Sequence, residues 1–399
     1  MAFSYHGWGR VASAERVGLN FRPRGILLHE DVAVGADWAG RDGAPRRPGC
    51  SMWRTSTARR PYRVQGSSSA GFALPAGAGE SSVRGVDRLK VILMGSGALA
   101  CPLLEGILAA GRDELVAVVT QPDRAGGRGL QCQTCEVKTL ALSRNLPVFT
   151  PENASDDAFV AQLAALKPDV VVVACYGQFL KKNLLAVPRL GTINVHPSLL
   201  PKYRGASPLQ WTLANGETET GVTVLRVTPK MDAGDILAQE QYPIAPDDDY
   251  GSLEPKLAAK GAELLVRVLD DFRVGKTQGV PQDDAQATFA RKLAKEDGLV
   301  DWSRPAEAIR NQLRGFAPWP GAYTFLPGGI LLKLHAVRTE AGTAGTAPGT
   351  VLEAAGAGPL VATGRGALRL LQVQPAGKKS MPGAAFLCGH KLAVGARLG

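Results

Sequence analysis

The chain has 399 residues, of which 45% are hydrophobic and 21% charged, and it carries a formal net charge of +10. This length suggests two or three domains, and because no run of 18 apolar residues occurs, the sequence predicts no membrane-spanning helix. The N-terminus lacks the layout of a secretory signal, and six cysteines in a chain this long do not make a disulfide scaffold, so we expect a cytoplasmic protein.

The first 88 residues differ in composition from the rest of the chain. They contain 13 Arg, no Lys and seven acidic residues, and they show no lasting helical or strand periodicity. Such a segment buries too little apolar surface to offset its ordering entropy. We therefore interpret residues 1–88 as a disordered or spurious N-terminal extension. A mitochondrial transit peptide is the alternative, but the seven acidic residues argue against it.

From residue 89 onward, apolar strand-like runs alternate with helical patterns. The elements expected in chain order are strands at 89–94, 115–119, 147–149, 169–174 and 191–195, helices at 99–110, 135–145, 156–167 and 252–272, and an antiparallel pair at 221–227 and 235–242. This alternation predicts a doubly wound α/β domain over residues 89–274.

A polar stretch with Gly and Pro, residues 275–290, reads as a linker to a second domain at 291–399. Short strands expected at 349–352, 359–363 and 367–373 predict a small barrel there. This region has 14 basic and 6 acidic residues, whereas residues 89–290 have 19 basic and 23 acidic. The contrast favours a polyanion partner for the C-terminal domain, although a generally basic proteome would produce the same composition.

The first βα turn, Gly95-Ser-Gly97-Ala-Leu-Ala100, matches a dinucleotide-binding fingerprint. That reading requires an acidic residue at the end of the second strand to hold a ribose. Here the strand ends in Val119-Thr-Gln-Pro122, and Asp123 comes only in the following loop. A tight turn explains these glycines equally well.

The loop after the second strand is basic and lies at the edge where ligands bind to such sheets. Its Arg124 and Arg128 suit phosphate groups, although an ordinary solvated loop has the same composition. Cys132 and Cys135 follow directly. A single C-x-x-C pair is poor evidence for zinc, and two incidental cysteines are favoured over a redox dithiol.

The most informative stretch begins at the strand that ends in Asn194-Val-His196-Pro197. Asn194 and His196 share one face of the strand, and Pro197 ends it. An amide and an imidazole at a sheet edge suit acyl transfer, because one donates to a developing oxyanion and the other moves a proton. Asp232, in a turn 36 residues after His196, is the candidate that orients the imidazole. By spacing alone, each of these residues is also an ordinary turn or strand-end residue.

Several motifs together resemble the methionyl-tRNA formyltransferases, within the folate-dependent formyltransferases. The resemblance covers roughly residues 89–399 and rests on motifs in the family's order. These are Gln121-Pro-Asp-Arg, Tyr176-Gly-Gln, Asn194-Val-His-Pro-Ser-Leu-Leu-Pro, Tyr203-Arg-Gly-Ala-Ser-Pro, Met231-Asp-Ala-Gly-Asp, Asp301-Trp-Ser-Arg-Pro, Phe316-Ala-Pro-Trp-Pro-Gly and Gln374-Pro-Ala-Gly-Lys-Lys-Ser-Met.

The resemblance implies a Rossmann-like formyltransferase domain followed by an OB-like β-barrel that contacts tRNA. It implies formyl transfer from 10-formyltetrahydrofolate to initiator methionyl-tRNA for translation initiation, by a monomer without a metal. The implied site residues are the catalytic Asn194, His196 and Asp232, the folate-binding Ser198, Leu199, Leu200 and Pro201, and the tRNA-binding Arg124 and Arg128.

Two departures from the family pattern stand out. Ser96-Gly97 replaces a frequent Thr-Pro, and Cys132 and Cys135 stand where relatives usually have no cysteine. The alternatives to the implied function are a hydrolase that releases formate from the folate, a sugar-nucleotide formyltransferase, and a non-catalytic tRNA-binding protein. The C-terminal motifs argue against the first two, and the intact trio argues against the third.

Overall fold

The computed structural model describes residues 87–126, 131–343 and 345–399, which all fall within one compact unit. The predicted extension, except its last two residues, and Arg128 lie outside the described residues. Those two expectations therefore stay predictions.

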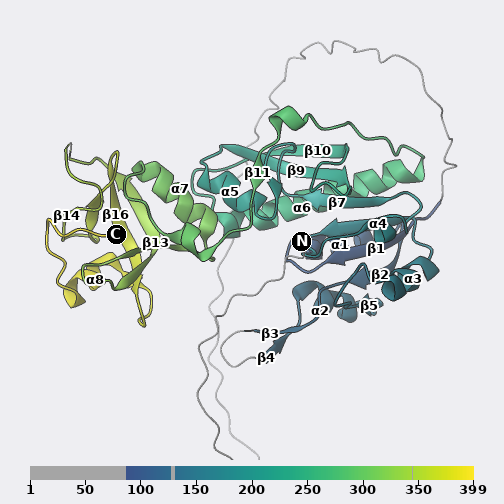
Figure 1. Cartoon of the computed structure of the whole chain (residues 1–399), viewed down its shortest axis with the longest axis horizontal. Helices are drawn as coiled ribbons and strands as arrows, with labels where there is room; N and C mark the ends of the chain where they lie inside the picture. Colours follow the sequence, from purple (N-terminus) through teal and green to yellow (C-terminus); the bar gives the residue numbers. More distant parts are fainter. Residues whose placement is uncertain (1–86, 127–130, 344) are drawn as a thin grey trace, which may run out of the picture. The chain divides into compact units, whose positions relative to one another are not determined.

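The N-terminal domain is built on a seven-stranded sheet with the strand order β10-β9-β7-β6-β1-β2-β5 (Figure 1). Its strands are β1 (Lys90–Gly95), β2 (Glu114–Val119), β5 (Val148–Phe149), β6 (Val170–Ala174), β7 (Thr192–His196), β9 (Glu219–Arg226) and β10 (Ile236–Pro243). Five neighbouring strands run parallel, namely β5, β2, β1, β6 and β7. Strands β9 and β10 form the predicted antiparallel pair at one edge. The expected Rossmann-like architecture is confirmed.

Helices cover both faces of this sheet. Val91 and Leu93 of β1 pack in one apolar core with α1 (Ala100–Ala110) and α6 (Tyr250–Arg273). Ile92 and Met94 belong to the core on the other face, with α3 (Asp157–Ala165) and α4 (Lys182–Leu185). Consecutive residues of a strand face opposite ways, so the unbroken apolar runs in the sequence reflect burial on both sides.

The glycines of the first βα turn serve close packing. A Cβ atom on Gly95 would lie 2.5 Å from Ala100 Cβ and 2.9 Å from the Ala174 carbonyl oxygen. One on Gly97 would lie 2.9 Å from the Cβ of Cys175. Because any side chain there would collide with the end of β6, the turn itself accounts for this part of the dinucleotide-like pattern.

Most predicted elements match the structure to within about two residues, but several were missed, including α7 (Ala306–Phe316) and β13 (Leu331–Glu340) of the C-terminal region. The basic loop is flanked by a hairpin, β3 (Arg124–Gly126) with β4 (Gln131–Gln133), and α2 (Glu136–Ser143) follows it. The missed α5 (Pro208–Ala214) and β8 (Arg204–Gly205) come directly after the informative stretch. Two- and three-residue strands carry too little periodicity for detection from sequence.

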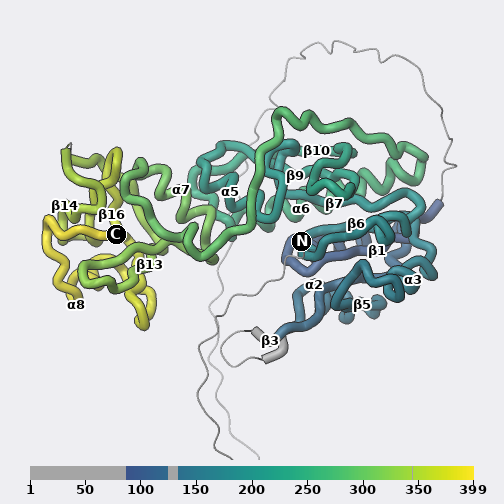
Figure 2. The backbone as a smooth tube through the Cα atoms, viewed as in Figure 1, coloured from purple at the N-terminus to yellow at the C-terminus, as the bar shows by residue number. Residues whose placement is uncertain are grey.

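The segment predicted as a linker is ordered against the N-terminal domain. It contains the short 3-10 helix η1 (Asp284–Gln286), and β11 (Phe289–Ala290) pairs in parallel with β8. Figure 2 shows the chain after α6 running back along the β10 edge before it reaches this pair. Its polar composition gave no indication of these backbone contacts.

The C-terminal region forms an antiparallel sheet in the order β12-β13-β16-β15-β14, with β17 paired to β16. The elements are η2 (Lys295–Gly298), α7 (Ala306–Phe316), β12 (Ala322–Phe325), β13 (Leu331–Glu340), β14 (Val351–Glu353), β15 (Leu360–Ala362), β16 (Ala367–Pro375), β17 (Met381–Pro382) and α8 (Gly383–Gly389). This arrangement agrees with the predicted OB-like architecture, which is a partly open barrel. Trp302 anchors its core and donates from Nε1 to the Thr324 hydroxyl at 3.0 Å.

Helix α7 packs against α5 of the N-terminal domain. Trp211 and Phe316 meet edge to face, with ring centroids 5.2 Å apart. Arg314 adds a hydrogen bond of 2.6 Å from its Nε to the Asp248 carbonyl oxygen, next to the N-terminus of α6. Among the described residues, no helix combines the length and apolar character needed to cross a membrane.

A charged cluster in the C-terminal sheet predicts a pH-dependent stability. Glu340 accepts hydrogen bonds from Arg369 at 2.8 Å and from Arg338 at 2.7 Å, and these bonds lower its pKa to about 2. A carboxylate whose pKa is depressed stabilises the fold above its unfolded pKa, and this contribution disappears as the pH falls through the folded pKa. Glu340→Gln should therefore lower the urea midpoint at pH 7, and the difference from the unsubstituted protein should shrink between pH 4.5 and pH 2.

The control is Glu307→Gln, which removes an exposed partner of Arg310 on α7. Exposed ion pairs of this kind contribute at most about 1 kcal/mol, so this variant should change little at any pH. An equal loss for Glu340→Gln at pH 7 and at pH 3 would contradict the electrostatic origin.

Candidate active site

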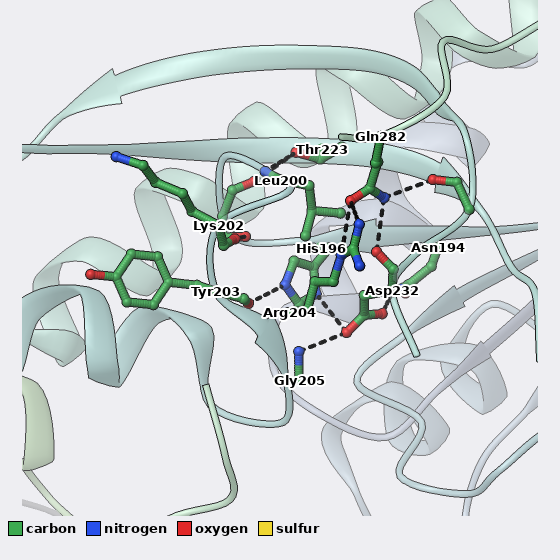
Figure 3. Close-up of polar contacts among 12 residues, drawn as sticks. Asn194, His196, Leu200, Lys202, Tyr203, Arg204, Gly205, Thr223, Asp232 and Gln282 are labelled. Carbon is green, nitrogen blue, oxygen red and sulfur yellow. Dashed lines mark hydrogen bonds and ion pairs between the residues drawn. The ribbon is translucent and has the colours of Figure 1, made fainter. Parts of the chain in front are cut away.

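The end of β7 presents an amide and an imidazole on one face of the sheet. Ile193 and Val195 point into the core with α1 and α6, so Asn194 and His196 face the opposite way. The side chain of His196 is only 5% exposed, whereas Asn194 is partly exposed. The alternation predicted from the sequence thus places both side chains together (Figure 3).

The tautomer of His196 follows from its hydrogen bond. Its Nε2 atom lies 2.9 Å from the backbone carbonyl oxygen of Tyr203. Since a carbonyl oxygen only accepts, Nε2 must carry a proton. The remaining nitrogen, Nδ1, lies 3.7 Å from Oδ2 of Asp232. In the neutral ring, Nδ1 is therefore the atom free to accept a proton.

Tyr203 is held firmly, which fixes the direction of this carbonyl group. Its backbone is left-handed, with φ at 61°, and its phenol donates to Glu217 at 2.7 Å and accepts from Asn215 at 3.1 Å. Burial raises the pKa of Tyr203 to about 12, so the phenol is neutral at physiological pH. This role has no signal in the sequence, because the contact uses a main-chain atom.

Asp232 connects the other members of the site. Its Oδ1 accepts a hydrogen bond of 3.3 Å from Asn194 Nδ2, and its Oδ2 accepts one of 2.9 Å from the backbone N–H of Gly205. Its backbone is also left-handed, with φ at 47°, a conformation that is uncommon outside Gly but that Asp adopts more readily than most residues. The structure thus brings together three side chains that lie up to 38 residues apart in sequence.

The candidate folate residues differ in their accessibility. Ser198 is buried and its hydroxyl donates to the Lys202 carbonyl oxygen at 2.8 Å, while Leu200 is 3% exposed. Leu199 and Pro201 are partly exposed. Only this second pair offers side-chain surface to a ligand in this conformation, whereas the first pair shapes the loop.

A hydrogen-bonded group of polar residues beside the trio, built around Arg204, was not recognised from the sequence. Arg204, whose side chain is 1% exposed, donates from Nε and Nη2 to the amide oxygen of Gln282 at 3.0 and 2.8 Å. Its Nη1 bonds Asp284 at 2.7 Å. Gln282 and Asp284 belong to the predicted linker, and their polarity alone gave no reason to associate them with Asp232.

The basic loop is described only in part. Arg124 is exposed at the start of β3, and its neighbour Asp123 forms an ion pair with Lys138 of α2. Arg128 lies outside the described residues.

Burial raises the pKa of Cys101, which is close to Cys135, to about 11, so its thiol stays protonated. Within the described ranges, no three His, Cys, Asp or Glu side chains gather as a metal ion would require.

Comparison with solved structures supports the fold. An N-formyltransferase from Helicobacter canadensis, in complex with folinic acid and dTDP-3-aminofucose, aligns with a TM-score of 0.54, at 17% identity, over 71% of this chain and 99% of that one. HypX from Aquifex aeolicus in complex with tetrahydrofolic acid aligns with a TM-score of 0.51, at 19% identity, over 75% of this chain. The chain spans about half of HypX, 47% of its length.

Comparison with families and curated sequences identifies the relatives. The formyl transferase family matches residues 88–269, and the formyl transferase C-terminal domain matches residues 292–391. A methionyl-tRNA formyltransferase from Roseiflexus sp. (strain RS-1) is 47% identical over 312 residues, covering 78% of this chain and 95% of the relative. One from Geobacter sulfurreducens is 45% identical over 311 residues, covering 78% of this chain and 97% of the relative. Because the similarity spans both regions and nearly the whole length of these relatives, the chain belongs to the methionyl-tRNA formyltransferase family.

Proposed function

We propose that this protein transfers a formyl group from 10-formyltetrahydrofolate to the α-amino group of initiator methionyl-tRNA. The observation that carries the proposal is the coverage of 95% or more of curated methionyl-tRNA formyltransferases at 45–47% identity. This similarity includes the C-terminal domain as well as the catalytic domain. The cluster of Asn194, His196 and Asp232 provides groups for the chemistry.

The reaction starts with attack of the neutral α-amine on the formyl carbon. The pKa of an α-amino group is about 8, so a useful fraction is neutral at physiological pH. The new N–C bond pushes the carbonyl electrons onto oxygen and forms a tetrahedral intermediate. Collapse of this intermediate breaks the bond to N10 and releases tetrahydrofolate, which takes up one proton, while the amine has lost one.

Asn194 is the group placed to stabilise the oxyanion. Its Nδ2 atom has two hydrogens, and the structure gives one of them to Asp232 over 3.3 Å. The second hydrogen is the donor that we assign to the developing oxyanion. Removing a single donor of this kind costs roughly 3 to 4 kcal/mol of transition-state stabilisation in comparable sites.

His196 is the group placed to move the proton, through Nδ1. Since Nε2 donates to the Tyr203 carbonyl oxygen, only Nδ1 can accept a proton from the attacking amine. Once protonated, Nδ1 faces Oδ2 of Asp232 at 3.7 Å, and the carboxylate stabilises the imidazolium. The same proton can then pass to N10 as the folate leaves.

The two substrates would approach from different parts of the protein. We assign the folate to the loop with Ser198, Leu199, Leu200 and Pro201, where Leu199 and Pro201 retain exposed surface. The tRNA would contact Arg124 and Arg128 of the basic loop and the C-terminal domain. The excess of 14 basic over 6 acidic residues at 291–399 supports that contact. We further propose a cytoplasmic monomer whose catalytic and tRNA-binding domains correspond to residues 89–274 and 291–399.

The direct test is an assay of the purified full-length chain with charged initiator tRNA and 10-formyltetrahydrofolate. We expect formylmethionyl-tRNA as the product, measured by resistance of the ester to copper-catalysed hydrolysis. A dTDP-linked amino sugar is the control acceptor and should remain unmodified. Formylation of the sugar without formylation of the tRNA would overturn the proposal.

Asn194→Ala tests the oxyanion assignment. Loss of one preorganised donor should lower kcat by about 100- to 1,000-fold, while the KM for methionyl-tRNA changes little because the interaction develops in the transition state. Steady-state kinetics and a thermal melt would be measured on the same preparation. A normal melt together with an unchanged kcat would show that another group binds the oxyanion.

Arg128→Ala tests the contact of the basic loop with the tRNA. We expect a higher KM for methionyl-tRNA and a weaker dependence of binding on salt, because one phosphate contact is lost. The matched control is Arg144→Ala at the end of α2, which removes an exposed arginine outside the loop. Equal effects of the two substitutions would indicate a general charge effect instead of a specific contact.

A further inference from the structure

The segment between the two domains touches both loops that carry the site. At its start, Val280 exchanges two backbone hydrogen bonds with Ile236, each 2.8 Å long, at the beginning of β10. At its end, β11 pairs with β8, immediately after Tyr203. We call residues 280–290 the strap. The strap therefore contacts both the turn that contains Asp232 and the loop that contains the Tyr203 carbonyl group, which orients His196.

The centre of the strap is the side chain of Gln282, which uses its full donor capacity on the catalytic turn. Its Nε2 donates to the backbone carbonyl oxygen of Asp232 at 2.8 Å and to that of Gly234 at 2.7 Å. These two carbonyl groups enclose the peptide units that follow Asp232. Figure 3 shows Gln282 between this turn and Arg204.

The other end of the Gln282 amide is fixed by a buried charge. Its Oε1 accepts from Nε and Nη2 of Arg204, whose side chain is 1% exposed. A buried guanidinium group requires partners for its donors, so the Gln282 oxygen is held in one orientation. Because the amide is planar, this also aims Nε2 at the turn.

The same strap holds the second loop. Thr288 accepts a hydrogen bond of 2.8 Å at its hydroxyl from the Tyr203 N–H, and its carbonyl oxygen accepts one of 2.9 Å from the Arg204 N–H. The Arg204 N–H shares a peptide unit with the Tyr203 carbonyl oxygen, which accepts the hydrogen bond from Nε2 of His196. Both orienting contacts of the imidazole thus depend on this one segment.

We propose that Gln282 is a positioning residue for Asp232, an inference that rests on the proposed formyl transfer. Asp232 has a left-handed backbone, which is uncommon outside Gly although Asp adopts it more readily than most residues. The two bonds from Gln282 hold the turn in this conformation. They hold the carboxylate toward Asn194 and His196, while Gln282 itself contacts no substrate.

Two substitutions separate the bonds that Gln282 makes. Gln282→Met keeps the length of the side chain and removes both donors and the acceptor without adding a charge. Gln282→Glu keeps an acceptor for Arg204 and replaces the donors to the turn with a carboxylate oxygen, which the carbonyl oxygens of Asp232 and Gly234 repel. For both variants we expect kcat for methionyl-tRNA formylation to fall by about 10- to 100-fold. KM for both substrates should stay within about twofold.

A double-mutant cycle checks that Gln282 acts through Asp232. In an Asp232→Ala background, Gln282→Met should lower the residual rate by less than twofold, because the carboxylate to be positioned is gone. Multiplied losses in the double variant would instead assign Gln282 an independent effect and overturn the proposal.

Gln286→Met is the matched control, since among the described residues the side chain of this exposed glutamine of the same strap bonds only to Asp283. It should keep the kcat and the melting temperature of the unsubstituted protein. Wild-type kcat in either folded Gln282 variant would overturn the inference while leaving formyl transfer established. Failure of the unsubstituted protein to formylate methionyl-tRNA would instead overturn the proposed function.

Discussion

The Asp232 carboxylate is the group on which the geometry of the site depends. It accepts hydrogen bonds from Asn194 and from the Gly205 backbone, and it faces Nδ1 of His196. These contacts link the turn between β9 and β10, in which Asp232 lies, to β7 and to β8. A single acceptor group therefore joins the segments whose relative position defines the proposed reaction centre.

The strap connects the candidate site to the C-terminal domain along the polypeptide chain. The strap that contacts the Asp232 turn continues directly into the segment leading to α7, and α7 packs on α5 through Trp211 and Phe316. Gly205 lies at the junction, since a Cβ there would come within 2.5 Å of the Ala290 carbonyl oxygen. The close approach of β8 and β11 therefore restricts the backbone beside the site as well as the path toward the C-terminal domain.

The fold by itself leaves the acceptor open. The N-formyltransferase of Helicobacter canadensis aligns over 71% of this chain, yet its complex holds dTDP-3-aminofucose. A Rossmann-like sheet offers the same edge for many chemistries, so function must be argued from groups placed on it. For this chain, the arguments for tRNA are the methionyl-tRNA formyltransferases that it matches over nearly their whole length and its basic C-terminal domain.

The sequence by itself determined the strands of the N-terminal sheet, the alternation that puts Asn194 and His196 on one face, and the family. These features are local, because strand periodicity and motif spacing are properties of neighbouring residues. Only the tertiary structure decided that Asp232 lies beside this pair and that the Tyr203 carbonyl oxygen determines the tautomer of His196. It also decided that Gln282 donates hydrogen bonds to the turn that contains Asp232. Those contacts use main-chain atoms or join residues up to 50 positions apart, and a backbone carbonyl has no side-chain signature in a sequence.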